Sequence, residues 1–275
     1  MIKLFLFFII LVPTYAHALN LTGYHFSDSF RYAIVDDSML EKYPGHFVFS
    51  TSAAYVKSPF FEADILNNKV SRNIIDYNQI TTAGGTYYLS NMSAVTLKTA
   101  YVQNRVYNIK HHSLADSELK GRFNIYKEGA HSVSINPVFT FPTGQKSNYT
   151  TTGTVGGGIA AVGEMKIEQV MLQGSLGYYN ASSNKALGIN YSELITSTLA
   201  ISWDFKPEWT INLETYRNFT VAADTGQDEG EYYLTVKNSS VKGMSFFGGA
   251  GIAGLYSPYS SNTTYFVGLR FFDFK

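Results

Sequence analysis

Apolar and polar residues alternate along most of this chain, and this alternation constrains the fold more than any other feature. The stretch Trp209–Glu214 is apolar at every second position, and residues 119–125 and 195–203 repeat the pattern. Side chains of a β-strand point alternately to opposite faces, so each stretch is expected to be a strand with one apolar face. Several stretches run for about 10–14 residues, whereas strands of soluble proteins average about five or six and a tilted membrane strand needs about 9–11. The pattern therefore predicts a transmembrane β-barrel.

The connections between these stretches are alternately short and long, as in bacterial outer-membrane barrels with short periplasmic turns and longer outer loops. We therefore expect an all-β, antiparallel up-and-down barrel of about 12 strands over residues 45–275. The expected strands are 46–57, 80–89, 93–107, 116–127, 131–141, 152–163, 167–180, 188–203, 208–219, 230–237, 243–254 and 263–273. The expected short turns are 90–91, 128–130, 163–165, 205–207 and 238–240, and the longer loops are 58–79, 108–115, 142–151, 181–187, 220–229 and 255–262.

The first 18 residues have the composition of a secretory signal peptide. A basic start at Lys3 precedes an apolar run over 4–12 and an A-x-A site that ends at Ala18. The run is too short for a membrane-spanning helix, which needs about 20 residues. Residues 19–44 are then an N-terminal segment for which two arrangements stay open: it plugs the lumen from the periplasmic side, or it trails. A short helix over 36–42 fits either arrangement.

A difference in free energy decides which face of the strands meets lipid. A Lys or Arg that faces the bilayer midplane costs about 2–4 kcal/mol, whereas an apolar side chain there costs nothing. The polar face is therefore expected to line the lumen, and the apolar face to meet lipid with aromatic residues near the two interfaces. The expected lumen-lining residues are Lys98, Glu118, Lys120, Arg122, Glu214 and Arg270, and the expected aromatic girdle is Tyr101, Phe139, Tyr178, Trp203, Trp209, Tyr265 and Phe271.

Composition excludes several other classes of protein. The chain has no Cys, which excludes a disulfide framework and a thiolate metal site, and its equal numbers of acidic and basic residues argue against nucleic acid as a partner. The glycines at 156–158 and 248–251 lack the pattern of a phosphate-binding loop, so we interpret them as strand glycines. A soluble β-sandwich is the alternative fold, and the strand lengths weigh against it.

Catalytic and metal-binding motifs are nearly absent. The best candidate is His111-His112-Ser113 with Asp116 in an expected outer loop, but its spacing is not diagnostic of a nucleophile–base group or a metal site. No G-x-S-x-G or H-E-x-x-H motif occurs, and residues 224–229 lack the ligand pattern of a calcium loop. We therefore expect no enzymatic activity, no cofactor and no bound metal.

Several short stretches resemble one group of outer-membrane barrels. These stretches are 43–49, 119–123, 141–144, 174–178, 248–254 and 267–270. Through them the chain resembles barrels related to the porin-like N-terminal domains of OmpA-type proteins, and it is similar to the barrel of the phenol-degradation meta-pathway outer-membrane proteins. It departs from the first group because no peptidoglycan-binding domain follows, and from usual barrel-assembly signals because Lys275 follows the final aromatic, Phe274.

This resemblance implies a membrane barrel of about twelve strands with a transport role. The expected function is a porin-like channel in a bacterial outer membrane, and its expected partners are membrane lipid, lipopolysaccharide, the barrel-assembly machinery and small solutes. Four basic residues against two acidic ones on the expected lumen face predict a weak preference for anions. The alternative is a non-conducting structural or adhesive barrel that acts through its outer loops, chiefly 58–79 and 220–229.

Overall fold

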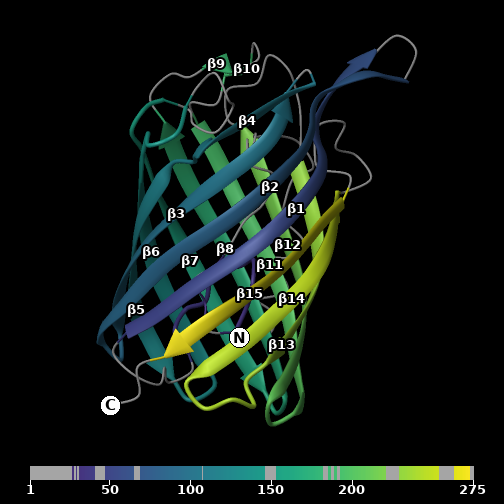
Figure 1. Ribbon diagram of the computed structural model, residues 1–275. Coiled ribbons are helices and arrows are strands. Elements are labelled where there is room, and N and C mark those ends of the chain that lie inside the picture. The colour runs from purple at the N-terminus through teal and green to yellow at the C-terminus, as the bar shows by residue number, and fades with distance from the viewer. Residues whose placement is uncertain are drawn as a thin grey trace.

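The structure is a computed structural model that describes residues 27, 29, 31–40, 47–64, 69–106, 108–145, 153–181, 185–186, 189–190, 193–220, 229–253 and 263–272. Within these ranges every regular element is a strand (Figure 1). No helix of the described residues is long and apolar enough to span a membrane. The strands are β1 (Phe47–Asp64), β2 (Lys69–Ser90), β3 (Ser93–Val106), β4 (Ile109–Leu114), β5 (Ser117–Glu128), β6 (His131–Phe141), β7 (Gly156–Ile167), β8 (Val170–Ala181), β9 (Lys185–Ala186), β10 (Ile189–Asn190), β11 (Glu193–Lys206), β12 (Trp209–Thr220), β13 (Glu229–Asn238), β14 (Met244–Ala253) and β15 (Thr263–Phe272).

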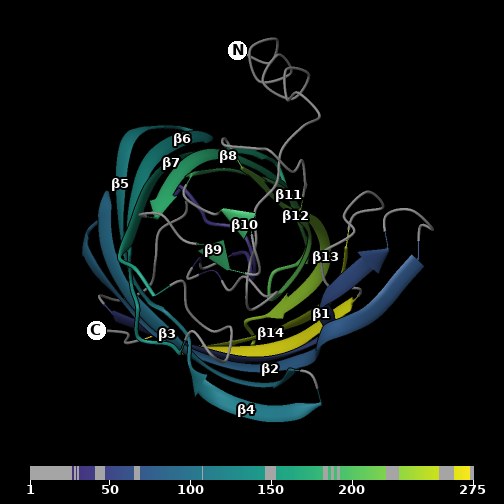
Figure 2. The ribbon, with the colours of Figure 1, turned by 90° about the horizontal axis from the view of Figure 1, so that it is seen from above.

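Antiparallel pairing closes the sheet into a ring. Thirteen of the fifteen described strands form one sheet, in which β1 pairs with both β2 and β15, and β2 also pairs with β3. The short strands β9 and β10 form a separate two-stranded sheet. One of the thirteen, β4, pairs only with β3 and lies outside the ring, which leaves twelve strands in the wall (Figure 2). The predicted fold, an antiparallel barrel of twelve strands, is confirmed.

Most strand positions also follow the prediction, but four connections do not. The strand expected over 188–203 begins too early, because β9 and β10 form a separate sheet and the wall strand β11 starts at Glu193. The loop expected over 58–79 is wrong, because β1 and β2 continue to pair beyond the ring, with register shifts near Phe60 and Phe61. The loop expected over 108–115 contains β4, which pairs with the last part of β3. The turn expected at 163–165 lies within β7, and the chain reverses instead at Glu168–Gln169, where Glu168 adopts a positive φ of 52°. Gly163 had suggested a turn, but it sits in the ladder opposite Gly174.

The two faces of the wall differ as the alternation predicts. Large apolar side chains such as Leu97, Leu199 and Leu234 are exposed on the outer face. Their neighbours Thr96, Thr198 and Thr235 are buried on the inner face. A closed barrel with an apolar outer surface satisfies its backbone groups internally and can be surrounded by hydrocarbon.

Aromatic rings cover glycines on the inner face of β14 and β15. A Cβ atom on Gly251 would collide with the Tyr233 ring, and one on Gly268 would collide with the Phe247 ring. Both rings are buried. These glycines therefore let the rings lie flat on the wall, as expected of strand glycines that permit close approach.

Candidate functional site in the barrel lumen

A short part of the N-terminal segment lies inside the barrel. We call residues 27–40 the inner segment, of which 27, 29 and 31–40 are described. Figure 2 shows it as a purple trace enclosed by the ring, and Ser29, Tyr32 and Ser38 have no exposed surface. Residues 36–40 form no helix, so the helix allowed over 36–42 is absent from that part, and residues 41–42 lie outside the described ranges. The signal peptide expected over 1–18 also lies outside them.

The wall at β11 and β12 holds the first half of the inner segment. The guanidinium of Arg31 donates two hydrogen bonds to the carboxylate of Asp204, at 2.9 and 2.8 Å. The carboxylate of Glu214 accepts hydrogen bonds from the backbone N–H groups of residues 33–35, at 3.2, 2.8 and 3.0 Å. Glu214 is fully buried, and these amides, with the hydroxyl of Thr235, compensate the cost of burying its charge.

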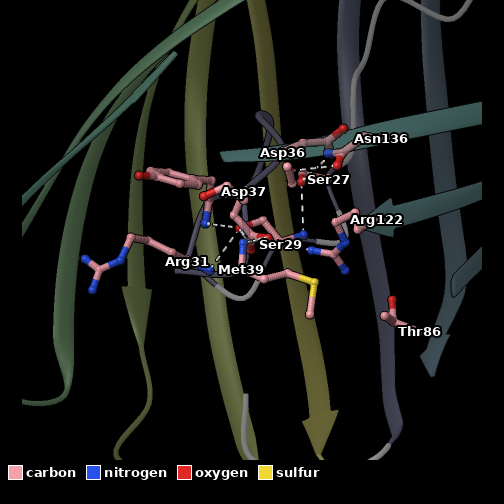
Figure 3. A network of polar contacts seen from close by, with 12 residues as sticks. Ser27, Ser29, Arg31, Asp36, Asp37, Met39, Thr86, Arg122 and Asn136 are labelled. Carbon is pink, nitrogen blue, oxygen red and sulfur yellow. Dashed lines mark hydrogen bonds and ion pairs between the residues drawn. The ribbon is translucent and has the colours of Figure 1, made fainter. Parts of the chain in front are cut away.

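Two basic side chains on β5 bind the next two carboxylates of the inner segment. Lys120 Nζ lies 2.7 Å from Asp36 Oδ1, and Arg122 lies 2.7 Å from Asp37 Oδ1. The second pair is dry, with exposed side-chain fractions of 1% for Arg122 and 2% for Asp37. Figure 3 shows Asp36, Asp37 and Arg122 within one polar network.

The wall at β6 and β7 holds the end of the inner segment. The carboxylate of Glu164 accepts hydrogen bonds from the Ser38 amide at 2.9 Å, from the Ser38 hydroxyl at 2.7 Å and from the Leu40 amide at 3.2 Å. The Ser38 hydroxyl also contacts the hydroxyl of Ser132. On β5, Asn124 donates to the Ser38 carbonyl and Lys127 donates to the Met39 carbonyl. The segment thus bridges opposite parts of the ring, in the half that contains the short turns.

The predicted lumen-lining residues all lie on the inner face. Lys120, Arg122, Glu214 and Arg270 are buried and contact the inner segment. Arg270 donates to the carbonyls of residues 27 and 32 and lies 4.4 Å from the centre of the Phe247 ring. Lys98 and Glu118 instead form an ion pair with each other across β3 and β5, at 2.9 Å.

The aromatic residues predicted for the girdle all lie on the outer face and are exposed. Trp203 and Trp209 flank the turn between β11 and β12, with Phe205 between them at ring-centre distances of 5.8 and 6.3 Å. Some of these aromatic residues lie next to the short turns, and others lie next to the longer loops. The exposed fractions are 39% for Tyr101, 51% for Phe139, 42% for Tyr178, 49% for Trp203, 39% for Trp209, 56% for Tyr265 and 37% for Phe271.

Sequence reasoning missed most of the partners of the inner segment. The sequence predicts a turn over 163–165, so it does not indicate that the Glu164 side chain of β7 points into the lumen. Asp204 follows Trp203 in the alternating pattern of β11, and that parity could have placed it inward. No sequence signal marks Arg31, Asp36 or Asp37 as interior residues, because this segment has no strand periodicity.

The interior also has an apolar part. Val56 on β1, Ile80 on β2 and Val102 on β3 are buried in one cluster with Ala33 and Ile34 of the inner segment. Burial raises the pKa of the nearby Tyr32 phenol well above its usual value, and the Glu164 carboxylate adds to this shift. Tyr32 therefore stays neutral at physiological pH.

The candidate catalytic residues His111, His112 and Ser113 lie on β4, and Asp116 follows this strand. Adjacent side chains of a strand point to opposite faces, so His111 and Ser113 share one face and His112 lies on the other. His112 is opposite Gln103 and lies 6.4 Å, centre to centre, from the Tyr101 ring. Among the described residues, no group of three or more His, Cys, Asp or Glu could hold a metal ion.

Comparison with known proteins identifies the fold but no family by sequence. No protein-family model matches the chain, and no curated protein matches it. The crystal structure of an outer membrane channel from Pseudomonas putida F1 is similar with a TM-score of 0.64 at 11% identity, covering 86% of this chain and 99% of that one. The NanC porin gives 0.58 at 9% identity over 81% and 98% of the two chains, and the KdgM porin 0.51 at 12% over 82% and 98%.

These neighbours are channels and porins, and the similarity to them lies in the barrel itself. A closed barrel with an apolar outer face requires lipid around it. The chain therefore has the twelve-strand fold of bacterial outer-membrane β-barrels.

Proposed function

We propose that this protein is a porin-like channel for small solutes whose lumen is narrowed by its own inner segment. One observation carries the proposal: Lys120, Arg122 and Glu214 on the wall bind groups of the inner segment. An eight-stranded barrel is filled by its own side chains, whereas sixteen strands enclose an aqueous channel. Here twelve strands leave room for an additional length of chain, so displacement of the segment would leave a polar passage.

The resemblance to porin-like barrels supports the transport role. The outer-membrane channel and the two porins share the fold, and the resemblance to phenol-degradation barrels points in the same direction. The apolar cluster at Val56, Ile80 and Val102 makes one side of the passage suitable for solutes with apolar groups. We propose that membrane lipid and lipopolysaccharide surround the exposed aromatic residues.

Single-channel recording in a planar bilayer tests the proposal. The refolded mature chain should give small discrete current steps, and the variant Asp36→Asn with Asp37→Asn should give larger or more frequent steps, because both ion pairs to β5 are lost. Only protein with a folded, heat-modifiable gel band is used. Folded protein of both kinds that never conducts would contradict the channel.

The second candidate is a non-conducting barrel that acts through its outer loops. The observation in its favour is the complete burial of Ser29 and Ser38, since a firmly bound segment closes the passage at that level. Silence of both proteins would favour this candidate. Deletions in the extension of β1 and β2 over 58–79, or in the expected loop over 220–229, would then abolish function without unfolding the barrel.

A further inference from the structure

The wall side chains inside the barrel bind mainly the backbone of the inner segment. They accept hydrogen bonds from the N–H groups of residues 33, 34, 35, 38 and 40. They donate to the carbonyl groups of residues 27, 31, 32, 36, 38 and 39. These donors and acceptors come from β5, β7, β8, β12 and β15. Because these contacts are made to backbone atoms, the same wall groups can bind a peptide with almost any side chains at most positions.

Two features add specificity to this backbone recognition. Lys120 and Arg122 select carboxylates at two successive positions, 2.7 Å from Asp36 and Asp37. Just before these positions, Ile34 packs into the apolar cluster of β1–β3. The inner segment itself is bent, with the Ser27 amide bonded to the Ala33 carbonyl. The inner face therefore fits a bent chain in which apolar residues precede an acidic pair.

Charged side chains at two places on the wall bind charged side chains of the inner segment. Asp204 on β11 binds Arg31, and Lys120 and Arg122 on β5 bind Asp36 and Asp37. A small neutral or purely apolar solute would not replace these ion pairs, and a buried charge that loses an ion-pair partner is strongly destabilising.

We propose that the lumen is a peptide-binding site, occupied here by the chain's own inner segment, and that short acidic peptides are the class of solute that replaces it. This inference rests on the proposed channel and names the solute of the same passage. The tethered segment acts as a competitor at an effective concentration in the millimolar range. A solute therefore gains access when the segment is weakened or displaced.

The test measures binding of a fluorescently labelled peptide with the sequence of residues 27–40 to the refolded, full mature chain in detergent. The chain carries Asp36→Asn and Asp37→Asn, so its own segment competes poorly while the peptide keeps both carboxylates. Fluorescence anisotropy should rise to saturation, with an affinity about ten-fold or more above that of a peptide bearing the same two Asn residues. A chain with Arg31→Gln, which loses the ion pair to Asp204, provides a second weakened segment if the first variant does not fold.

A wall control locates the binding. Adding Lys120→Gln and Arg122→Gln should abolish the difference between the acidic and the amidated peptide. The inference is overturned if the peptide shows no saturable binding. It is also overturned if the Asp36→Asn, Asp37→Asn chain with Lys120 and Arg122 intact binds both peptides with equal affinity. Peptide binding to a barrel that never conducts would uphold the site and overturn the channel, whereas current steps that the peptide never blocks would overturn the site and uphold the channel.

Discussion

On the outer face of the wall most large side chains are apolar and exposed, whereas the side chains of the inner face are mostly buried and many of them are polar or charged. Leu199 and Thr198 are neighbours in β11 and show this contrast, with exposed fractions of 45% and 7%. The outer face needs no particular partner, since any hydrocarbon satisfies it. The inner face needs named partners, and the inner segment supplies many of them. The outer face therefore depends on the membrane, whereas the inner face depends on one short stretch of chain.

The largest expected effect comes from breaking the dry ion pair between Asp37 and Arg122. Asp37→Ala leaves a buried guanidinium without this carboxylate, which costs about 3–5 kcal/mol. Release of the inner segment relieves that cost, so a Cys placed at Ser38 should react with a membrane-impermeant thiol reagent roughly 100-fold faster or more. The chain has no Cys of its own, so the label reports this site alone.

The partly exposed pair between Lys98 and Glu118, with exposed side-chain fractions of 22% each, is the matched control for that experiment. Glu118→Ala should change the labelling rate little, because ion pairs with access to water contribute about 0–1 kcal/mol. Equal labelling rates for Asp37→Ala and Glu118→Ala would contradict the dependence of the segment on the β5 wall.

A charge on the outer face should have the next largest effect. Leu199→Arg places a guanidinium near the middle of β11 in hydrocarbon, which costs about 2–4 kcal/mol. Ile167→Arg, at the end of β7 beside a turn, should cost only about 0–1 kcal/mol. Equilibrium unfolding in lipid vesicles measures both, and identical unfolding midpoints would show that lipid does not surround Leu199.

A smaller effect is expected where an inner ring covers a glycine. Gly251→Ala brings a methyl group into the Tyr233 ring and should cost about 1–3 kcal/mol, the usual range for overpacking. Gly163→Ala is the control, because its nearest atom would be the Gly174 carbonyl oxygen at 3.9 Å. The temperature at which the folded gel band disappears should fall for the first variant only, and an equal fall for both would count against the packing described.

Ion selectivity should change least. The inner segment brings one basic and two acidic side chains into the lumen, Arg31, Asp36 and Asp37. Weakening it with Asp36→Asn and Asp37→Asn should therefore shift the reversal potential under a salt gradient by a few millivolts toward anions. The structure adds Glu164, Asp204 and Lys127 to the four basic and two acidic wall residues expected from the sequence. The prediction is therefore the direction of the shift. A shift toward cations would contradict it.

The sequence predicts the strands of the barrel wall better than the contacts of the inner segment in the lumen. Alternation fixes the parity of each strand, so Lys120 and Arg122 could be placed inward and Trp203 outward from period alone. The continued pairing of β1 with β2 beyond the ring was missed, because Pro59 and three register shifts interrupt the pattern. The turn after β7 was misplaced because Gly163 looks like a turn residue but lies in a ladder.

The partners inside the lumen could not be predicted for a different reason. A contact such as Arg31 with Asp204 joins residues 173 positions apart, and nothing in the local sequence of either residue indicates the other. Backbone recognition by Glu214 leaves still less trace, because any residue except proline can supply the N–H groups at 33–35. These contacts require the closed ring, which brings β5, β7 and β12 around one segment.

The most direct test of the account is a reversible cross-link between the inner segment and the wall. The hydroxyls of Ser38 and Ser132 are in contact, so the double variant Ser38→Cys with Ser132→Cys should form a disulfide on oxidation. Single-channel conductance is then recorded on the same refolded protein before and after reduction. The account predicts a small or absent current while the bond is intact and larger, more frequent steps after reduction. The same conductance in both states, with the bond verified by mass spectrometry, would contradict the claim that the inner segment controls the passage.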